Sequence, residues 1–180
     1  MVASLDYNEF FENSKRFFEE EDITNSLESF QKAMERIDRS HIEQKSDYTQ
    51  FLQSVLQYCQ DKNLLEQEAL VFRALGRTHS LFKQHVESMK YHYKSLKIQK
   101  KLGKKQETAE GLEFLAEDIE VSGNYDKCIS TFQEASEIYQ ELGKLRKVEE
   151  IQKELSRLQE FSREMVEDEF LLNKFQVDKY

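Results

Sequence analysis

Four glutamates near the middle of the chain are spaced so that they could act together. Glu110, Glu113, Glu117 and Glu120 follow one another at steps of three, four and three residues, which places their side chains on one face of a helix. Either they pair with neighbouring cations and solubilise the surface, or they bind a lysine- or arginine-bearing segment of a partner. Exposed ion pairs contribute only about 0–1 kcal/mol each, so charge here would set specificity and association rate more than affinity.

A second charged stripe has the opposite sign. Lys90, Lys94, Lys97 and Lys101 share one helix face, with Glu87 as the nearest acid. We interpret this basic stripe as a solvated convex face. The alternatives are contact with an acidic protein, with RNA or with an anionic membrane surface.

Residues for catalysis or metal binding are not arranged in any familiar pattern. His79, His85 and His92 lack the i, i+4 spacing that would put two metal ligands on one helix face. No nucleophile elbow, phosphate-binding loop or dinucleotide-binding glycine pattern occurs in the sequence. We therefore predict a protein with no catalytic residues, no metal site and no cofactor.

The composition predicts one helical domain. The 180 residues include 35 acids, 26 bases, five glycines and no proline, for a net charge of −9. The lack of proline favours helix throughout, and the acidity argues against nucleic-acid binding. No apolar run reaches the length of a membrane span and the N-terminus is polar, so we expect a soluble, cytoplasmic protein. Cys59 and Cys128 are interpreted as small buried hydrophobes.

Apolar residues recur at intervals of three and four along the whole chain and predict about eight helices. The expected ranges are about 4–20, 23–38, 43–60, 63–82, 85–102, 106–121, 125–142 and 145–166. Gly103, Gly123 and Gly143 follow three of these helices as left-handed caps. The break at 61–63 is weak, so the third and fourth helices could also form one long helix.

Two of the helix pairs repeat each other at a distance of 40 residues. When residues 69–104 are aligned with 109–144, Ala69 meets Ala109 and Leu75 meets Leu115, and the triplet Leu-Gly-Lys at 102–104 returns at 142–144. A repeat of this length that contains two helical patterns predicts a stacked array of helical hairpins. Such arrays usually bind other proteins.

The repeated residues resemble the tetratricopeptide repeat (TPR) family in its extended, 40-residue form. The first-helix pattern is Phe72, Leu75 and Gly76, then Leu112, Leu115 and Ala116; the second-helix pattern is Ser88, His92 and Ser95, then Cys128, Phe132 and Ala135. Ser26, Phe30 and Ala33 repeat the second pattern near the N-terminus. The resemblance implies an all-α, right-handed helical-hairpin solenoid. Its small residues would let neighbouring helices approach closely.

This interpretation makes residues 1–166 a single domain. It contains repeats at about 5–38, 69–103 and 109–143, an inserted helix at 43–60 and a capping helix at 145–166. Residues 167–180 would form a tail that either folds back to cap the stack, or is offered to a partner or to a second copy of the chain.

The resemblance also implies where a partner would bind, because the first helix of each TPR pair lines a concave groove. The groove positions carried onto this chain are Arg73, Arg77, Glu110, Glu113, Glu117, Glu120, Lys153 and Arg157. We expect a non-catalytic protein-interaction adaptor that binds a peptide or helix of a partner, with a basic segment as the specific hypothesis. The alternatives are a small acidic chaperone for a secreted or assembling protein, and a regulator of a partner enzyme.

Overall fold

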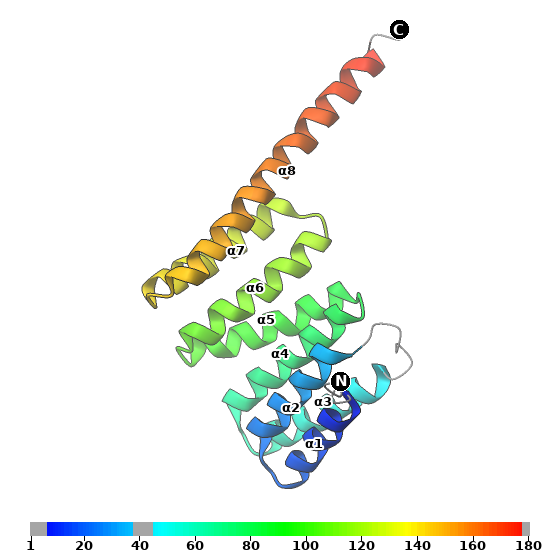
Figure 1. Cartoon of the computed structure of the whole chain (residues 1–180), viewed down its shortest axis with the longest axis vertical. Coiled ribbons are helices and arrows are strands. Elements are labelled where there is room, and N and C mark those ends of the chain that lie inside the picture. Colours follow the sequence, from blue (N-terminus) through cyan, green and yellow to red (C-terminus); the bar gives the residue numbers. More distant parts are fainter. Residues whose placement is uncertain (1–6, 38–44, 178–180) are drawn as a thin grey trace, which may run out of the picture.

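The chain folds into a stack of helices (Figure 1). The computed structural model describes the backbone of residues 7–37 and 45–177 and the side chains of residues 7–37 and 46–165. These residues form α1 (Tyr7–Glu19), α2 (Ile23–Arg36), α3 (Lys45–Asp61), α4 (Leu65–Leu81), α5 (His85–Lys101), α6 (Lys105–Val121), α7 (Tyr125–Glu141) and α8 (Leu145–Val177), joined by turns and without a strand. The predicted all-α fold of about eight helices is confirmed.

The helix lengths and the turns repeat regularly along the stack. Helices α3 to α7 each contain 17 residues, and three residues separate each of them from the next helix. In every one of these turns the middle residue has a positive φ: Asn63, Lys83, Gly103, Gly123 and Gly143. A left-handed residue ends a helix abruptly and lets the chain reverse. The weak break at 61–63 is therefore a full turn, and α3 and α4 are separate helices.

The two predicted repeats lie side by side. Helices α4 and α5 form one hairpin, α6 and α7 form the next, and α5 packs against α6. The four helices have equal lengths and a 40-residue offset. The two hairpins are thus built to one plan, as the sequence repeat predicted.

Small side chains tie the helices of each hairpin together at equivalent points. The Ser26 hydroxyl donates a hydrogen bond to the Ser14 carbonyl at 2.8 Å, and the Ser88 hydroxyl donates to the Gly76 carbonyl at 2.7 Å. The Cys128 thiol makes the same contact with the carbonyl of Ala116 at 3.3 Å. All three donors stand 12 residues after their acceptors, so one contact recurs in three hairpins.

Helix α3 fills the space behind the first hairpin, a position that the sequence did not reveal. Its aromatic residues Tyr48 and Phe51 pack edge-on against Phe11 of α1, with ring centroids 4.7 and 5.5 Å apart, and Phe51 stacks on Phe30 of α2 at 5.9 Å. Helix α3 also packs against α4. It therefore joins the N-terminal hairpin to the repeats that follow.

Helix α8 is longer than predicted. Its buried residues Ile151, Leu155 and Leu158 face the stack, and α8 packs against α7. The helix expected at 145–166 continues to Val177, and its C-terminal part projects beyond the stack instead of folding back over it (Figure 1). The apolar side chains of the predicted tail lie outside the described residues.

Among the described residues, no helix combines the length and the apolar character that crossing a bilayer requires.

Candidate functional site

Three hollows lie in a row along the stack and form one continuous groove. The α2/α4 section encloses about 290 Å³, the central section about 600 Å³ and the α6/α8 section about 330 Å³. Met34 and Arg77 line both the first and the second section, and Glu117 lines both the second and the third. A ligand of extended or helical shape could therefore contact all three sections.

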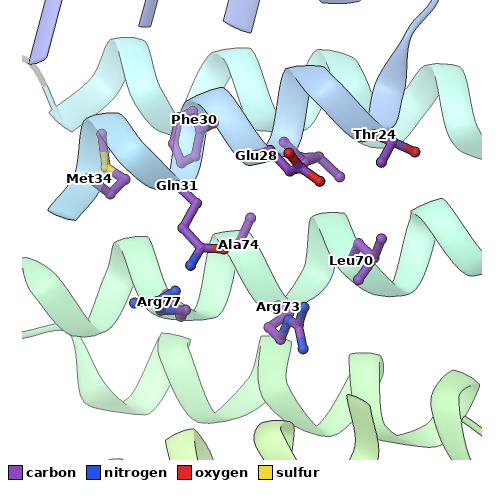
Figure 2. Close-up of a pocket in the computed structure, with 10 residues that line it drawn as sticks. Thr24, Glu28, Phe30, Gln31, Met34, Leu70, Arg73, Ala74 and Arg77 are labelled. Carbon is purple, nitrogen blue, oxygen red and sulfur yellow. The ribbon is translucent and has the colours of Figure 1, made fainter. Parts of the chain in front are cut away.

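The three sections carry different side chains at equivalent positions of the repeats. Ala74, Phe114 and Glu154 are separated by steps of 40 residues, and each lines a different section of the groove. In Figure 2, Ala74 lies on α4 and the side chain of Gln31 extends towards it from α2. Phe114 occupies part of the central section, and Glu154 adds a carboxylate to the α6/α8 section.

Three of the four stripe glutamates are paired within the protein. Arg73 Nη1 lies 2.9 Å from Glu110 Oε2, and Arg157 Nη2 lies 2.9 Å from both carboxylate oxygens of Glu120. Glu113 accepts a hydrogen bond from the Tyr139 hydroxyl and lies 3.2 Å from Lys147 Nζ. These three glutamates therefore pair with neighbouring cations of the protein.

Glu117 differs from the other three. It is exposed, and within the described residues no cation lies close enough to form an ion pair with it, unlike its neighbours. Partial desolvation in the groove raises the pKa of Glu117 from its ordinary value, and the carboxylates of Glu113 and Asp118 raise it further. An added cation at this point would be stabilised by the surrounding negative charge.

Arg77 occupies the position equivalent to Glu117 in the preceding repeat, 40 residues earlier. Burial lowers the pKa of its guanidinium, the opposing pull of nearby carboxylates being weaker. The guanidinium carbon lies 4.6 Å from the centroid of the Phe114 ring, which is a favourable cation–π geometry. Arg77 thus stands between the α2/α4 section and the acidic part of the groove. Lys153, also predicted as a groove residue, lines the α6/α8 section.

A buried polar cluster lies beneath the central section. Asp118 is only 1% exposed, and its Oδ2 competes with the Gly76 carbonyl for the single hydrogen of the Ser88 hydroxyl. Its Oδ1 lies 2.8 Å from Nδ1 of His85. His92 Nε2 lies 3.6 Å from Asp118 Oδ2, too far for a hydrogen bond. Both ring nitrogens of His92 have no hydrogen-bond partner in the described part of the chain.

His92 is neutral because of its surroundings. Its side chain is 1% exposed, and burial lowers its pKa to about 4 against the opposing influence of Asp118. The ring stacks on Phe114 with centroids 6.0 Å apart and lies directly against Gly76. A Cβ atom at position 76 would come within 2.6 Å of the ring, so glycine is required there as long as His92 occupies this site.

Sequence reasoning missed this cluster. It examined the histidines for i, i+4 spacing on one helix, whereas the structure brings His85 and His92 of α5 to Asp118 of α6. The available signal was that Asp118 continues the apolar face of Leu115 and Ile119. In the described residues, no three histidine, cysteine or acidic side chains gather in a way that could hold a metal ion.

The basic stripe lies apart from the groove. Lys90, Lys94, Lys97 and Lys101 are all exposed on α5, and none of them lines the three sections. Lys90 pairs with Glu87 at 2.6 Å, and Lys94 Nζ lies 5.3 Å from the centre of the Tyr91 ring. The stripe is therefore a separate surface.

Comparison with known proteins shows the fold and no more. No protein-family model and no curated protein matches the sequence. The crystal structure of BtubC (BKLC) from P. vanneervenii is similar, with a TM-score of 0.68 and 13% sequence identity over 84% of this chain and 62% of that chain. The chain thus spans less than two thirds of the length of BtubC. At this identity the likeness supports the all-α helical-hairpin fold, and membership of the tetratricopeptide family stays a prediction.

Proposed function

We propose that this chain is a non-catalytic protein-interaction adaptor that binds a basic peptide or helix along the groove. The observation that carries the proposal is Glu117. It lines two sections of the groove, whereas the other three stripe glutamates already have cationic partners. Glu117 is exposed, and Arg77 attracts it without forming an ion pair, so its carboxylate is available to a lysine or arginine of a ligand.

The charge around Glu117 supports the same ligand. The carboxylates that line the α6/α8 section are Glu113, Glu117, Glu120, Glu150 and Glu154. Glu117 and Glu154 are separated by 37 residues on adjacent repeats, the same separation that joins Arg73 to Glu110. The other carboxylates of this section already have cationic partners: Lys147 pairs with Glu113 and Glu150, and Arg157 pairs with Glu120 and Glu154. Glu117 is therefore the carboxylate of this section, within the described residues, that a basic segment would neutralise.

The proposal is tested with peptides selected by the protein itself. Random peptides of about 12 residues, long enough for an extended or helical ligand, are displayed on phage and selected on the wild-type chain. We expect the selected peptides to be enriched in lysine and arginine. Binding of synthetic copies, measured by fluorescence anisotropy, should weaken steeply as salt rises from about 0.05 M to about 0.5 M.

A charge reversal locates the site. Glu117→Lys should weaken binding by about tenfold or more, because it places a like charge against the basic residue. Glu137→Lys is the matched control, since Glu137 is an exposed glutamate of α7 outside the groove; it should leave binding unchanged. Selected peptides without basic residues, or equal binding by the two variants, would contradict the proposal. Circular dichroism verifies that both variants are folded.

A further inference from the structure

The α2/α4 section is a pocket of about 290 Å³ with a mixed lining. Its apolar residues are Leu27, Phe30, Met34, Leu70 and Ala74, and its polar residues are Thr24, Glu28, Gln31, Arg73 and Arg77. Figure 2 shows Phe30 and Met34 of α2 above it and Leu70 and Ala74 of α4 below it.

A small residue, Ala74, lines the pocket on the α4 side. Ala74 occupies the position that Phe114 holds 40 residues later. Between α4 and α6 that phenyl ring fits under Arg77 and on His92. Between α2 and α4 the equivalent residue is alanine, which carries no ring. A phenyl group is therefore a side chain that this architecture accommodates at the equivalent place, and a partner could supply one.

The pocket opens into the rest of the groove. Met34 and Arg77 line both the pocket and the central section. The central section is also lined by His92, a 1% exposed side chain whose ring nitrogens lack partners in the described residues.

We propose that the α2/α4 pocket binds a bulky apolar side chain, such as Phe, Leu or Met, of the same partner segment whose lysine or arginine pairs with Glu117. This inference rests on the proposed function and adds a second recognition element to it. The pocket is lined by Arg73, Arg77 and one carboxylate, Glu28, whereas five carboxylates line the α6/α8 section at the other end. The segment therefore binds in one direction, with its apolar residue at α2 and its basic residue towards α8.

Filling the pocket provides the test. Ala74→Phe places in the pocket the side chain that the next repeat carries at this position. The probes are the synthetic peptides selected on the wild-type chain, measured by fluorescence anisotropy. We expect Ala74→Phe to weaken their binding by about tenfold or more, the effect of excluding one large apolar side chain. Gln133→Phe is the control, because it adds the same ring at an exposed position of α7.

A peptide variant makes the test independent of how well Ala74→Phe folds. Replacing the enriched apolar residue of the peptide by alanine should weaken binding to the wild-type chain by a similar factor. If Ala74→Phe is folded, it should bind this peptide no worse than the wild-type chain does, because both changes remove the same contact.

The outcomes separate the two proposals. If binding depends on Glu117 but neither on position 74 nor on an apolar peptide residue, the pocket inference is wrong and the adaptor proposal stands. If binding does not depend on Glu117, both are wrong. If the wild-type chain sediments as a dimer and Ala74→Phe makes it a monomer, the pocket is filled by a second copy of the chain, and the inference is overturned.

Discussion

At the scale of single residues, the contact between His92 and Gly76 shows how one repeat departs from the next. Phe132 stands 40 residues after His92 and belongs to the C-terminal hydrophobic cluster. In the earlier repeat the aromatic is a histidine, and its neighbour at position 76 has no side chain to collide with it. The charged groups facing the ring are Asp118 on α6 and Arg73 and Arg77 on α4.

This site predicts a pH-dependent stability. The pKa of His92 is about 4 in the folded chain and 6.5 as a free side chain, so the unfolded chain takes up a proton there before the folded chain does. The free energy of unfolding should therefore fall as the pH drops from 6.5 to 4, by on the order of 3 kcal/mol. Above pH 6.5 the contribution is fully present.

His92→Phe isolates that contribution. It introduces the aromatic residue that the next repeat uses, and it removes two buried nitrogen atoms that lack partners. Urea unfolding between pH 7 and pH 4 should show a shallower loss of stability for His92→Phe than for the wild type. Equal pH dependence of the two proteins would show that His92 is not the group responsible.

At the scale of helices and turns, the predicted boundaries agree with the observed ones because each helix carries its own apolar face and each turn has a local cause. The residue type alone predicted three turns, at Gly103, Gly123 and Gly143. The turns at Asn63 and Lys83 use the same left-handed conformation without glycine. Because the α3–α4 turn contains no glycine, the sequence predicted it only weakly.

Lys83 is the most strained of these turn residues. A side chain in the left-handed region costs about 1–2 kcal/mol, and asparagine is among the few residues that adopt it readily. Lys83→Gly should therefore raise the free energy of unfolding by about 0.5–1 kcal/mol, after the greater flexibility of glycine in the unfolded chain is subtracted.

Asn63→Gly is the matched comparison, since Asn63 has a similar φ of 55° against 59° for Lys83. It should change stability by less than Lys83→Gly does. Both values are measured by urea unfolding at neutral pH. Destabilisation by Lys83→Gly would mean that its side chain makes contacts that outweigh the strain.

At the scale of the whole molecule, the core consists of two hydrophobic clusters in sequence. The first contains buried residues of α1 to α4, and the second contains buried residues of α5 to α8. From α3 onwards each helix packs against the next helix in the chain. In such a stack, stability is approximately a sum over neighbouring layers.

A cavity at one end should therefore weaken that end first. Leu158 of α8 is fully buried in the second cluster, and Leu158→Ala should cost about 2–5 kcal/mol locally. Hydrogen exchange followed by mass spectrometry should show faster exchange in α7 and α8 and unchanged exchange in α1 to α3. Leu52→Ala, in the first cluster, should give the opposite pattern. Uniform acceleration along the chain would indicate one cooperative unit.

The sequence by itself determined what depends on residues within a few positions of each other. Apolar spacing set the helices, glycines marked three turns, and the 40-residue repeat predicted that α4–α5 and α6–α7 pack as equivalent hairpins. It also placed four glutamates on one helix face.

Only the tertiary structure decided which of those glutamates are paired, because their partners lie 34 to 37 residues away on the next layer. The same holds for the placement of α3 behind the first hairpin, for the meeting of His85 and His92 with Asp118, and for the pocket at Ala74. These features depend on how neighbouring helices are placed against each other, and helix periodicity carries no information about that placement.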